Sequence, residues 1–215
     1  MGSCNSGGKG GEGWTGGGGG AKVTILETTS LISAREGQQL EVDESLQTFK
    51  DVHDEYGYAV YDLQLAKLGA DGDGVLAYYD GTNIAFNEKY FNKKLMEGAY
   101  ADDVKNGYHP SQGNKTALQA VASHELGHAL TDQAISKMGS KYGKQDGAEA
   151  ILRIAQKQVG HKGKLADMAG KISGYAKESA RECIAEAFAD VYCNGKNAHR
   201  ESHAIVNAMN KYLKP

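Results

Sequence analysis

The stretch Ser123-His124-Glu125-Leu126-Gly127-His128 decides how the rest of the chain is interpreted. Its two histidines are four residues apart, so on a helix they lie on one face and can both reach a single metal ion. Glu125 lies beside them, as in metal sites where a glutamate takes a proton from water. The flanking residues are apolar or small, and a buried helix with these polar groups needs a partner for them. The pattern predicts a zinc site, although a structural histidine pair is the alternative.

A catalytic zinc site requires a third protein ligand and one position open to water. Glu182 and Glu186 are again four residues apart, on one face of a predicted helix over residues 178–193. The alternative is that both carboxylates are simply solvated. If one of them binds the ion, the other can accept the free ring N–H of a ligand histidine. The spacing leaves open which glutamate has which role.

The other histidines are weaker candidates. His199 and His203 are also four apart, but Arg200, Glu201 and Ser202 between them are typical of a solvated helix start. The remaining three have no partner at helical spacing, and we interpret them as surface or hydrogen-bonded histidines. They are His53, His109 and His161.

Two segments together resemble a known family. Residues 124–130 (HELGHAL) and 175–188 (YAKESARECIAEAF) resemble zincin metalloproteases of the anthrax lethal factor and Pro-Pro endopeptidase type. They are also similar to zincin-like domains encoded by bacteriophages near head-assembly genes. Outside these segments the resemblance is loose, over residues 75–193. The resemblance implies the following roles: His124, His128 and Glu182 as zinc ligands, Glu125 as base, Tyr175 as oxyanion donor and Glu186 as support for a ligand.

Most of the strand patterns lie in the first half of the chain, and the second half has mainly helix patterns. This separation predicts an α+β fold. Strands are expected at 22–26, 58–68, 75–79 and 83–87, the last two forming a hairpin around Asp80-Gly81. Helices are expected at 45–56, 115–137 (capped by Asn114), 148–159, 164–172, 178–193 and 200–213, with a loop at 99–113. With the resemblance, the expectation is a zincin-like fold: a small mixed sheet with a hairpin, an active-site helix and a mainly helical C-terminal lobe.

The domain prediction has two parts. Residues 1–20 are so rich in glycine that they cannot bury enough apolar surface to order themselves, and we expect a flexible arm. The start of the arm, MGSCNS, fits a myristoylation pattern, but an unmodified glycine-rich tail is the simpler interpretation. Residues 21–215 form the predicted metallopeptidase domain, with lobes at about 21–139 and 140–215.

Composition excludes several classes of function. A net charge of −3 argues against nucleic-acid binding, and the chain has no apolar run long enough for a membrane span. Three cysteines cannot build a disulfide framework, which favours a reducing compartment. The sequence shows no secretory leader, so we expect a cytoplasmic or virion-associated protein.

The function predicted from these features is a zinc-dependent metalloendopeptidase that hydrolyses peptide bonds through a metal-activated water. Its partner would be a peptide or protein that lies along the strand 83–87, with Ile84, Ala85 and Phe86 as the substrate edge, a placement that the family resemblance partly implies. The alternative is a phage particle or assembly component that binds phage structural proteins and keeps a zinc site for a structural role. A zinc hydrolase that is not a peptidase also remains open.

Overall fold

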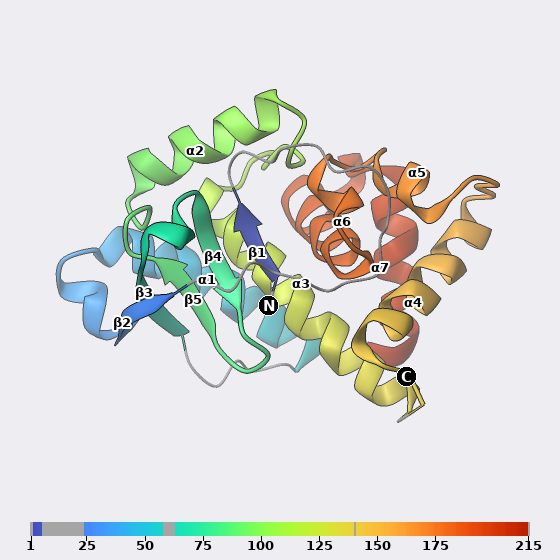
Figure 1. The fold of residues 1–215 in the computed structure, drawn as a ribbon, viewed down its shortest axis with the longest axis horizontal. Helices are drawn as coiled ribbons and strands as arrows, with labels where there is room; N and C mark the ends of the chain where they lie inside the picture. Colours follow the sequence, from blue (N-terminus) through green and yellow to red (C-terminus); the bar gives the residue numbers. More distant parts are fainter. Residues whose placement is uncertain (1, 6–23, 58–62, 140, 215) are drawn as a thin grey trace.

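The computed structural model describes residues 2–5, 24–57, 63–139 and 141–214. The helices are α1 (Gln39–Tyr56), α2 (Lys93–Lys105), α3 (Ala117–Met138), α4 (Lys144–Gln158), α5 (Leu165–Ala169), α6 (Ala180–Asn194) and α7 (Arg200–Leu213). The strands are β1 (Gly2–Asn5), β2 (Ile25–Ser30), β3 (Leu63–Leu68), β4 (Val75–Tyr79) and β5 (Ile84–Asn87). This confirms a mixed α+β fold in which the second half of the chain is helical (Figure 1).

The strands form one small mixed sheet in the order β1-β4-β5-β3-β2. Only β3 and β5 are parallel among these neighbours, and the other pairs are antiparallel. The predicted hairpin is present, since β4 and β5 are joined by a turn that Asp80 closes. Its Oδ1 accepts the backbone N–H groups of Thr82 at 2.8 Å and Asn83 at 2.7 Å. Such Asx turns are local, which is why the sequence predicted this one.

The prediction that strand 83–87 is a sheet edge was wrong. β5 lies between β4 and β3, and its residues Ile84, Ala85, Phe86 and Asn87 are all buried. The parallel pairing of β3 with β5 covers the side that was expected to be open. A strand pairing between distant segments cannot be read from alternation within a four-residue strand.

Helix α3 lies in the centre of the molecule. It packs against α1, α2 and β4 on the sheet side and against α4, α6 and α7 on the other (Figure 1). Its first residues are held by a capping box, in which the Thr116 hydroxyl accepts from the N–H of Gln119 and the Gln119 side chain accepts from the N–H of Thr116. Thr116 therefore caps this helix, not the expected Asn114. Two apolar clusters form the core, one on each side of α3. Both include α3 residues, so α3 packs against both clusters.

A helix replaces part of the expected loop at 99–113. Helix α2 extends from Lys93 to Lys105, and the Asn92 side chain caps it by accepting from the N–H groups of Lys94 and Leu95. Met96 and Tyr100 are buried at helical spacing against the sheet side of the core. The loop between α2 and α3 is correspondingly short, at residues 106–116.

The other predicted elements are present with shifted ends. The predicted strands 22–26 and 58–68 correspond to β2 and β3, and residues 22–23 and 58–62 lie outside the described residues. Of the arm predicted at 1–20, the structure describes Gly2–Asn5, which pair with β4 as β1; the rest of the arm lies outside the described residues. In the part of the chain that is described, no helix combines the length and apolarity needed to cross a membrane.

Candidate metal centre

Two helices bring the predicted ligands together. His124 and His128 lie one turn apart in α3, and Glu182 lies in the first turn of α6. Ser179 caps α6 by accepting the backbone N–H of Glu182 at 3.1 Å, which fixes where this turn begins. All three side chains are almost completely shielded from solvent. The structure thus joins residues that are more than fifty positions apart in the chain.

The three ligand atoms form a nearly regular triangle. The His124 Nε2 lies 3.1 Å from the His128 Nε2 and 3.2 Å from the Glu182 Oε2, and the His128 Nε2 lies 3.1 Å from the same oxygen. Ligands at 2.0–2.1 Å from a tetrahedral ion are separated from one another by about 3.3 Å. The triangle therefore has the size that one such ion requires, and this group could hold a metal ion.

Hydrogen bonding independently favours a cation here. The Nδ1 of His124 lies 2.8 Å from a carboxylate oxygen of Glu186, so in the neutral ring Nδ1 carries the proton and Nε2 has a bare lone pair. That lone pair faces the carboxylate oxygen of Glu182, which is also an acceptor. Two buried acceptors in contact need a positive charge between them, which a proton on the ring or a metal ion would supply. The donor set fits the ion.

Glu182 and Glu186 have different surroundings, which separates their roles. Burial alone would raise the pKa of Glu182, but the charges and hydrogen bonds of His128 and His124 outweigh it and hold this pKa well below its usual range. Burial likewise acts to raise the pKa of Glu186, and His109 and His124 together lower it to about 2. Both carboxylates are therefore ionised, Glu182 toward the ring Nε2 atoms and Glu186 toward Nδ1.

Glu186 holds three partners at once. Its Oε1 accepts from the Nδ1 atoms of His124 at 2.8 Å and His109 at 2.9 Å, and its Oε2 accepts from the Ser173 hydroxyl at 2.7 Å. This arrangement fixes the ring orientation of His124, as carboxylates behind metal-binding histidines commonly do. The sequence predicted Glu186 as such a support, through the family resemblance alone.

His109 is the residue that the sequence reasoning missed. It is buried, its ring packs at 6.2 Å from the ring of His124, and it shares Glu186 with that histidine. The prediction that it is a hydrogen-bonded histidine is compatible with this position, but its place beside the cluster was unexpected. No spacing rule connects residue 109 with residue 124 or 186, so the sequence holds no signal for it.

Tyr175 packs on the cluster, and Glu125 is next to His124 in the chain. The ring of Tyr175, in the short turn Tyr175–Lys177, stacks on the ring of His124 with centroids 5.7 Å apart. Glu125 is fully buried in α3, adjacent in the chain to the ligand His124. The Tyr175 ring thus contacts one of the candidate ligands, and Glu125 occupies the buried position that follows His124 in α3.

The other residues that the sequence offered as candidates lie outside the group of His124, His128 and Glu182. His199 pairs with Asp190, whose Oδ2 is 2.9 Å from its Nδ1, and His203 is outside the metal group found among the described residues. Cys183 is buried in α6, and burial strongly raises the pKa of its thiol, which disfavours the thiolate that binds metals. Ile84, Ala85 and Phe86 belong to the apolar core.

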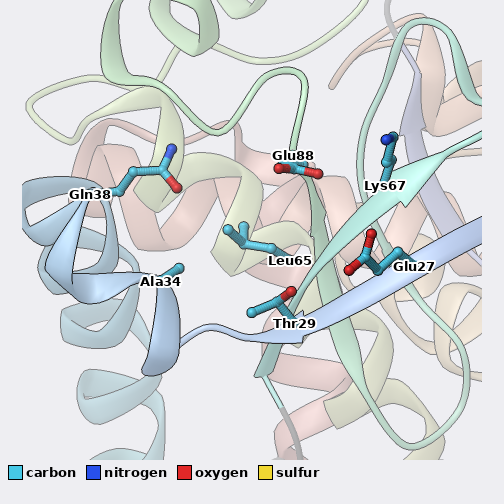
Figure 2. Close-up of a pocket in the computed structure, with 7 residues that line it drawn as sticks. All are labelled: Glu27, Thr29, Ala34, Gln38, Leu65, Lys67 and Glu88. Carbon is cyan, nitrogen blue, oxygen red and sulfur yellow. The ribbon is translucent and has the colours of Figure 1, made fainter.

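A hollow at the β2 side of the sheet is separate from the cluster (Figure 2). Glu27, Lys67 and Glu88 supply its charged lining, and none of its lining residues belongs to α3 or α6. It contains no group of metal-ligating side chains within the described residues. Among the described residues, the group that could hold a metal ion lies at the α3–α6 contact.

Comparison with protein-family models, with curated proteins and with solved structures gave no match to this chain.

Proposed function

We propose that this protein is a zinc-dependent metalloendopeptidase with a zincin-like fold. The observation that supports this most is the buried triangle of His124, His128 and Glu182, with the carboxyl residue Glu125 on the same helix. A structural site would use a fourth protein ligand, whereas the group found among the described residues has three members. One position would remain for a reactant.

Zinc is the ion that this donor set suits best. Two imidazole nitrogens and one carboxylate oxygen in a compact triangle are typical of catalytic zinc, while magnesium and calcium prefer oxygen ligands and higher coordination. Zinc, when bound, supplies a Lewis acid that polarises a carbonyl group and lowers the pKa of water to about 7.

The side chains around the triangle have the remaining roles. Glu125 accepts the proton of the attacking water and passes it to the leaving amine. Tyr175 donates a hydrogen bond to the oxyanion that develops on the scissile carbonyl. Glu186 keeps the His124 ring oriented through the 2.8 Å contact at Nδ1. Each role requires a fixed side chain, and all three residues are buried.

The substrate in this proposal is an extended peptide along β4. β4 packs directly on α3, and its side away from β5 is the one on which β1 pairs in antiparallel register. A peptide bound at that side would form the same backbone hydrogen bonds by strand addition. β4, whose outer side is paired with β1 alone, thus replaces β5, which lies between β4 and β3, as the proposed substrate strand.

The experiment combines metal analysis with cleavage of a diverse peptide library, run on the unaltered protein and on Glu125→Gln. We expect one zinc ion per chain in both proteins and a loss of turnover of about 10²–10⁴-fold in the variant. Glu36→Gln, at an exposed position in a short helical turn, is the matched control and should retain activity.

Normal turnover in a zinc-loaded Glu125→Gln protein would reject Glu125 as the base. Zinc binding without cleavage of any peptide would instead favour the structural alternative, such as a component of a phage particle, or a zinc hydrolase with another substrate.

A further inference from the structure

His109 occupies a position that the proposed roles do not explain. Its side chain is almost fully buried between aromatic rings, with Tyr100 stacked on it at 5.4 Å and Tyr175 against its edge at 5.3 Å. Burying an imidazole among aromatic rings is costly unless its nitrogens are bonded. Its Nδ1 is bonded to Glu186 at 2.9 Å, whereas its Nε2 has no hydrogen-bond partner among the described residues. Nδ1 is therefore the ring nitrogen through which His109 is bonded to the site.

The bond from Nδ1 is part of a chain of contacts that ends at the metal ligands. The same Glu186 oxygen that accepts from His109 also accepts from His124. If His109 were replaced by a residue without this donor, the carboxylate could tilt toward Ser173, which holds its other oxygen. Glu186 would then be held by one hydrogen bond fewer, and the His124 ring that it orients would be held less firmly.

The loop that carries His109 also holds Tyr175. The N–H of Tyr175 donates to the carbonyl of Tyr108 at 3.0 Å, and the N–H of Gly174 donates to the carbonyl of Gly107 at 2.8 Å. Tyr108 and His109 both pack against the Tyr175 ring. The segment 107–109 thus fixes the backbone and the ring of Tyr175 while it fixes Glu186.

We propose that His109 is a positioning residue that acts on two parts of the site at once. Its Nδ1–H orients Glu186, and through it the ligand His124, while its ring holds Tyr175 in place. The first action governs metal affinity and depends only on the metal-binding group. The second governs turnover and rests on the proposed peptidase function. His109 itself contacts neither ion nor substrate in this role.

Three variants separate the two actions. The amide nitrogen of an asparagine can occupy the place of the histidine Nδ1, and that of a glutamine the place of Nε2. His109→Asn therefore keeps the donor toward Glu186 and loses the ring, and His109→Gln moves the donor away. His109→Phe keeps a ring and loses the donor. His53→Asn and His53→Phe, at an exposed position of α1, are the matched controls.

The first measurement is zinc affinity by competition with a chromophoric chelator, together with the visible spectrum of the Co²⁺-loaded protein. We expect His109→Asn to stay within about threefold of the unaltered protein, and His109→Phe and His109→Gln to bind about 10–100-fold more weakly. The Co²⁺ bands should shift in the same two variants. Equal affinities for Asn and Gln would overturn the proposal, and this comparison decides it even if His109→Phe does not fold.

The second measurement is kcat and KM at saturating zinc. The ring should matter here, so His109→Asn should lose more kcat than His109→Phe, with little change in KM. The reverse order would overturn the role toward Tyr175. If the unaltered protein cleaves no peptide but the zinc affinities follow the expected order, the peptidase function fails and the positioning of Glu186 stands. Absence of zinc and cobalt binding in the unaltered protein would overturn both.

Discussion

Gly127 of α3 and Ala185 of α6 face each other with no room for an additional methyl group. A Cβ atom placed on Gly127 would lie 2.8 Å from the Cα of Ala185 and 3.2 Å from its carbonyl oxygen. Gly127 precedes the ligand His128, and Ala185 lies between the two glutamates of α6. The close approach of the two helices at this glycine is therefore what allows Glu182 to reach both histidines.

Gly127→Ala should weaken metal binding by forcing the helices apart. Because the clash involves backbone atoms, no side-chain rotation relieves it. We expect the free energy of unfolding to fall by about 1–3 kcal/mol, as for overpacked cores. Zinc affinity, measured by chelator competition on the folded protein, should fall as well.

Gly98→Ala in α2 is the control for this substitution, since a Cβ at that position meets no atom within 4 Å. It should leave zinc affinity unchanged and raise helix stability by up to about 1 kcal/mol. Unchanged zinc affinity in Gly127→Ala would mean that the close helix contact does not position Glu182.

The sequence predicted the parts of this site that are local to one helix. His124 and His128 share a face because they are one turn apart, and the same holds for Glu182 and Glu186. The spacing could not tell which glutamate meets the ring Nε2 atoms, because that depends on the start and axial position of α6. The structure has Glu182 at the Nε2 atoms and Glu186 at the Nδ1 of His124, and the roles implied for the two residues stay predictions.

What the sequence did not predict depends on contacts between distant segments. β5 is an interior strand because β3 pairs with it in parallel, and His109 reaches Glu186 across 77 positions of the chain. Helix α2 is a different case. Asn92 as a cap, followed by Met96 and Tyr100 at helical spacing, was a readable local signal for it.

Glu182→Ala and Glu186→Ala should differ in metal affinity. Removal of Glu186 leaves all three ligand atoms in place and should weaken zinc binding by about 10–100-fold, the usual cost of losing a group that orients a ligand. Removal of Glu182 deletes a ligand atom and should cost more. Calorimetric titration of the two metal-free variants with zinc measures both. A stronger effect for Glu186→Ala would shift the ligand assignment by one helical turn.

Acidification should destabilise the metal-free protein, starting below about pH 6.5. Burial lowers the pKa of His128 below its ordinary value of 6.5. Below that pH the unfolded chain binds a proton that the folded protein does not. The free energy of unfolding therefore decreases as the pH decreases. Glu186 adds a second loss between its ordinary pKa of 4.5 and its folded value of about 2.

Urea unfolding in the presence of a chelator, at a series of pH values, measures this dependence. One proton contributes at most about 1.4 kcal/mol for each pH unit. His128→Gln should remove the loss that begins near pH 6.5 and retain the loss at lower pH. A stability that is flat between pH 7 and 5 in the unaltered protein would contradict a neutral, buried His128.

Deletion of residues 2–5 should raise kcat/KM for peptide substrates if β4 is the substrate strand. Gly2 pairs with Tyr79 and Ser3 with Tyr78, so β1 uses the backbone groups of β4 that an added peptide strand would need. A substrate must displace β1 before it can pair there, and this competition raises KM. Removing β1 should therefore lower KM and leave kcat unchanged, since no residue of the metal group lies in β1.

Deletion of four glycines at 16–19 shortens the chain equally and retains β1, so it serves as the control. Steady-state kinetics of the three proteins with one extended peptide distinguish the cases. A lower KM in the 2–5 deletion alone places the peptide on β4, because the two deletions differ only in whether the paired strand remains. An unchanged KM in both deletions would move the substrate to another surface of the α3–α6 site.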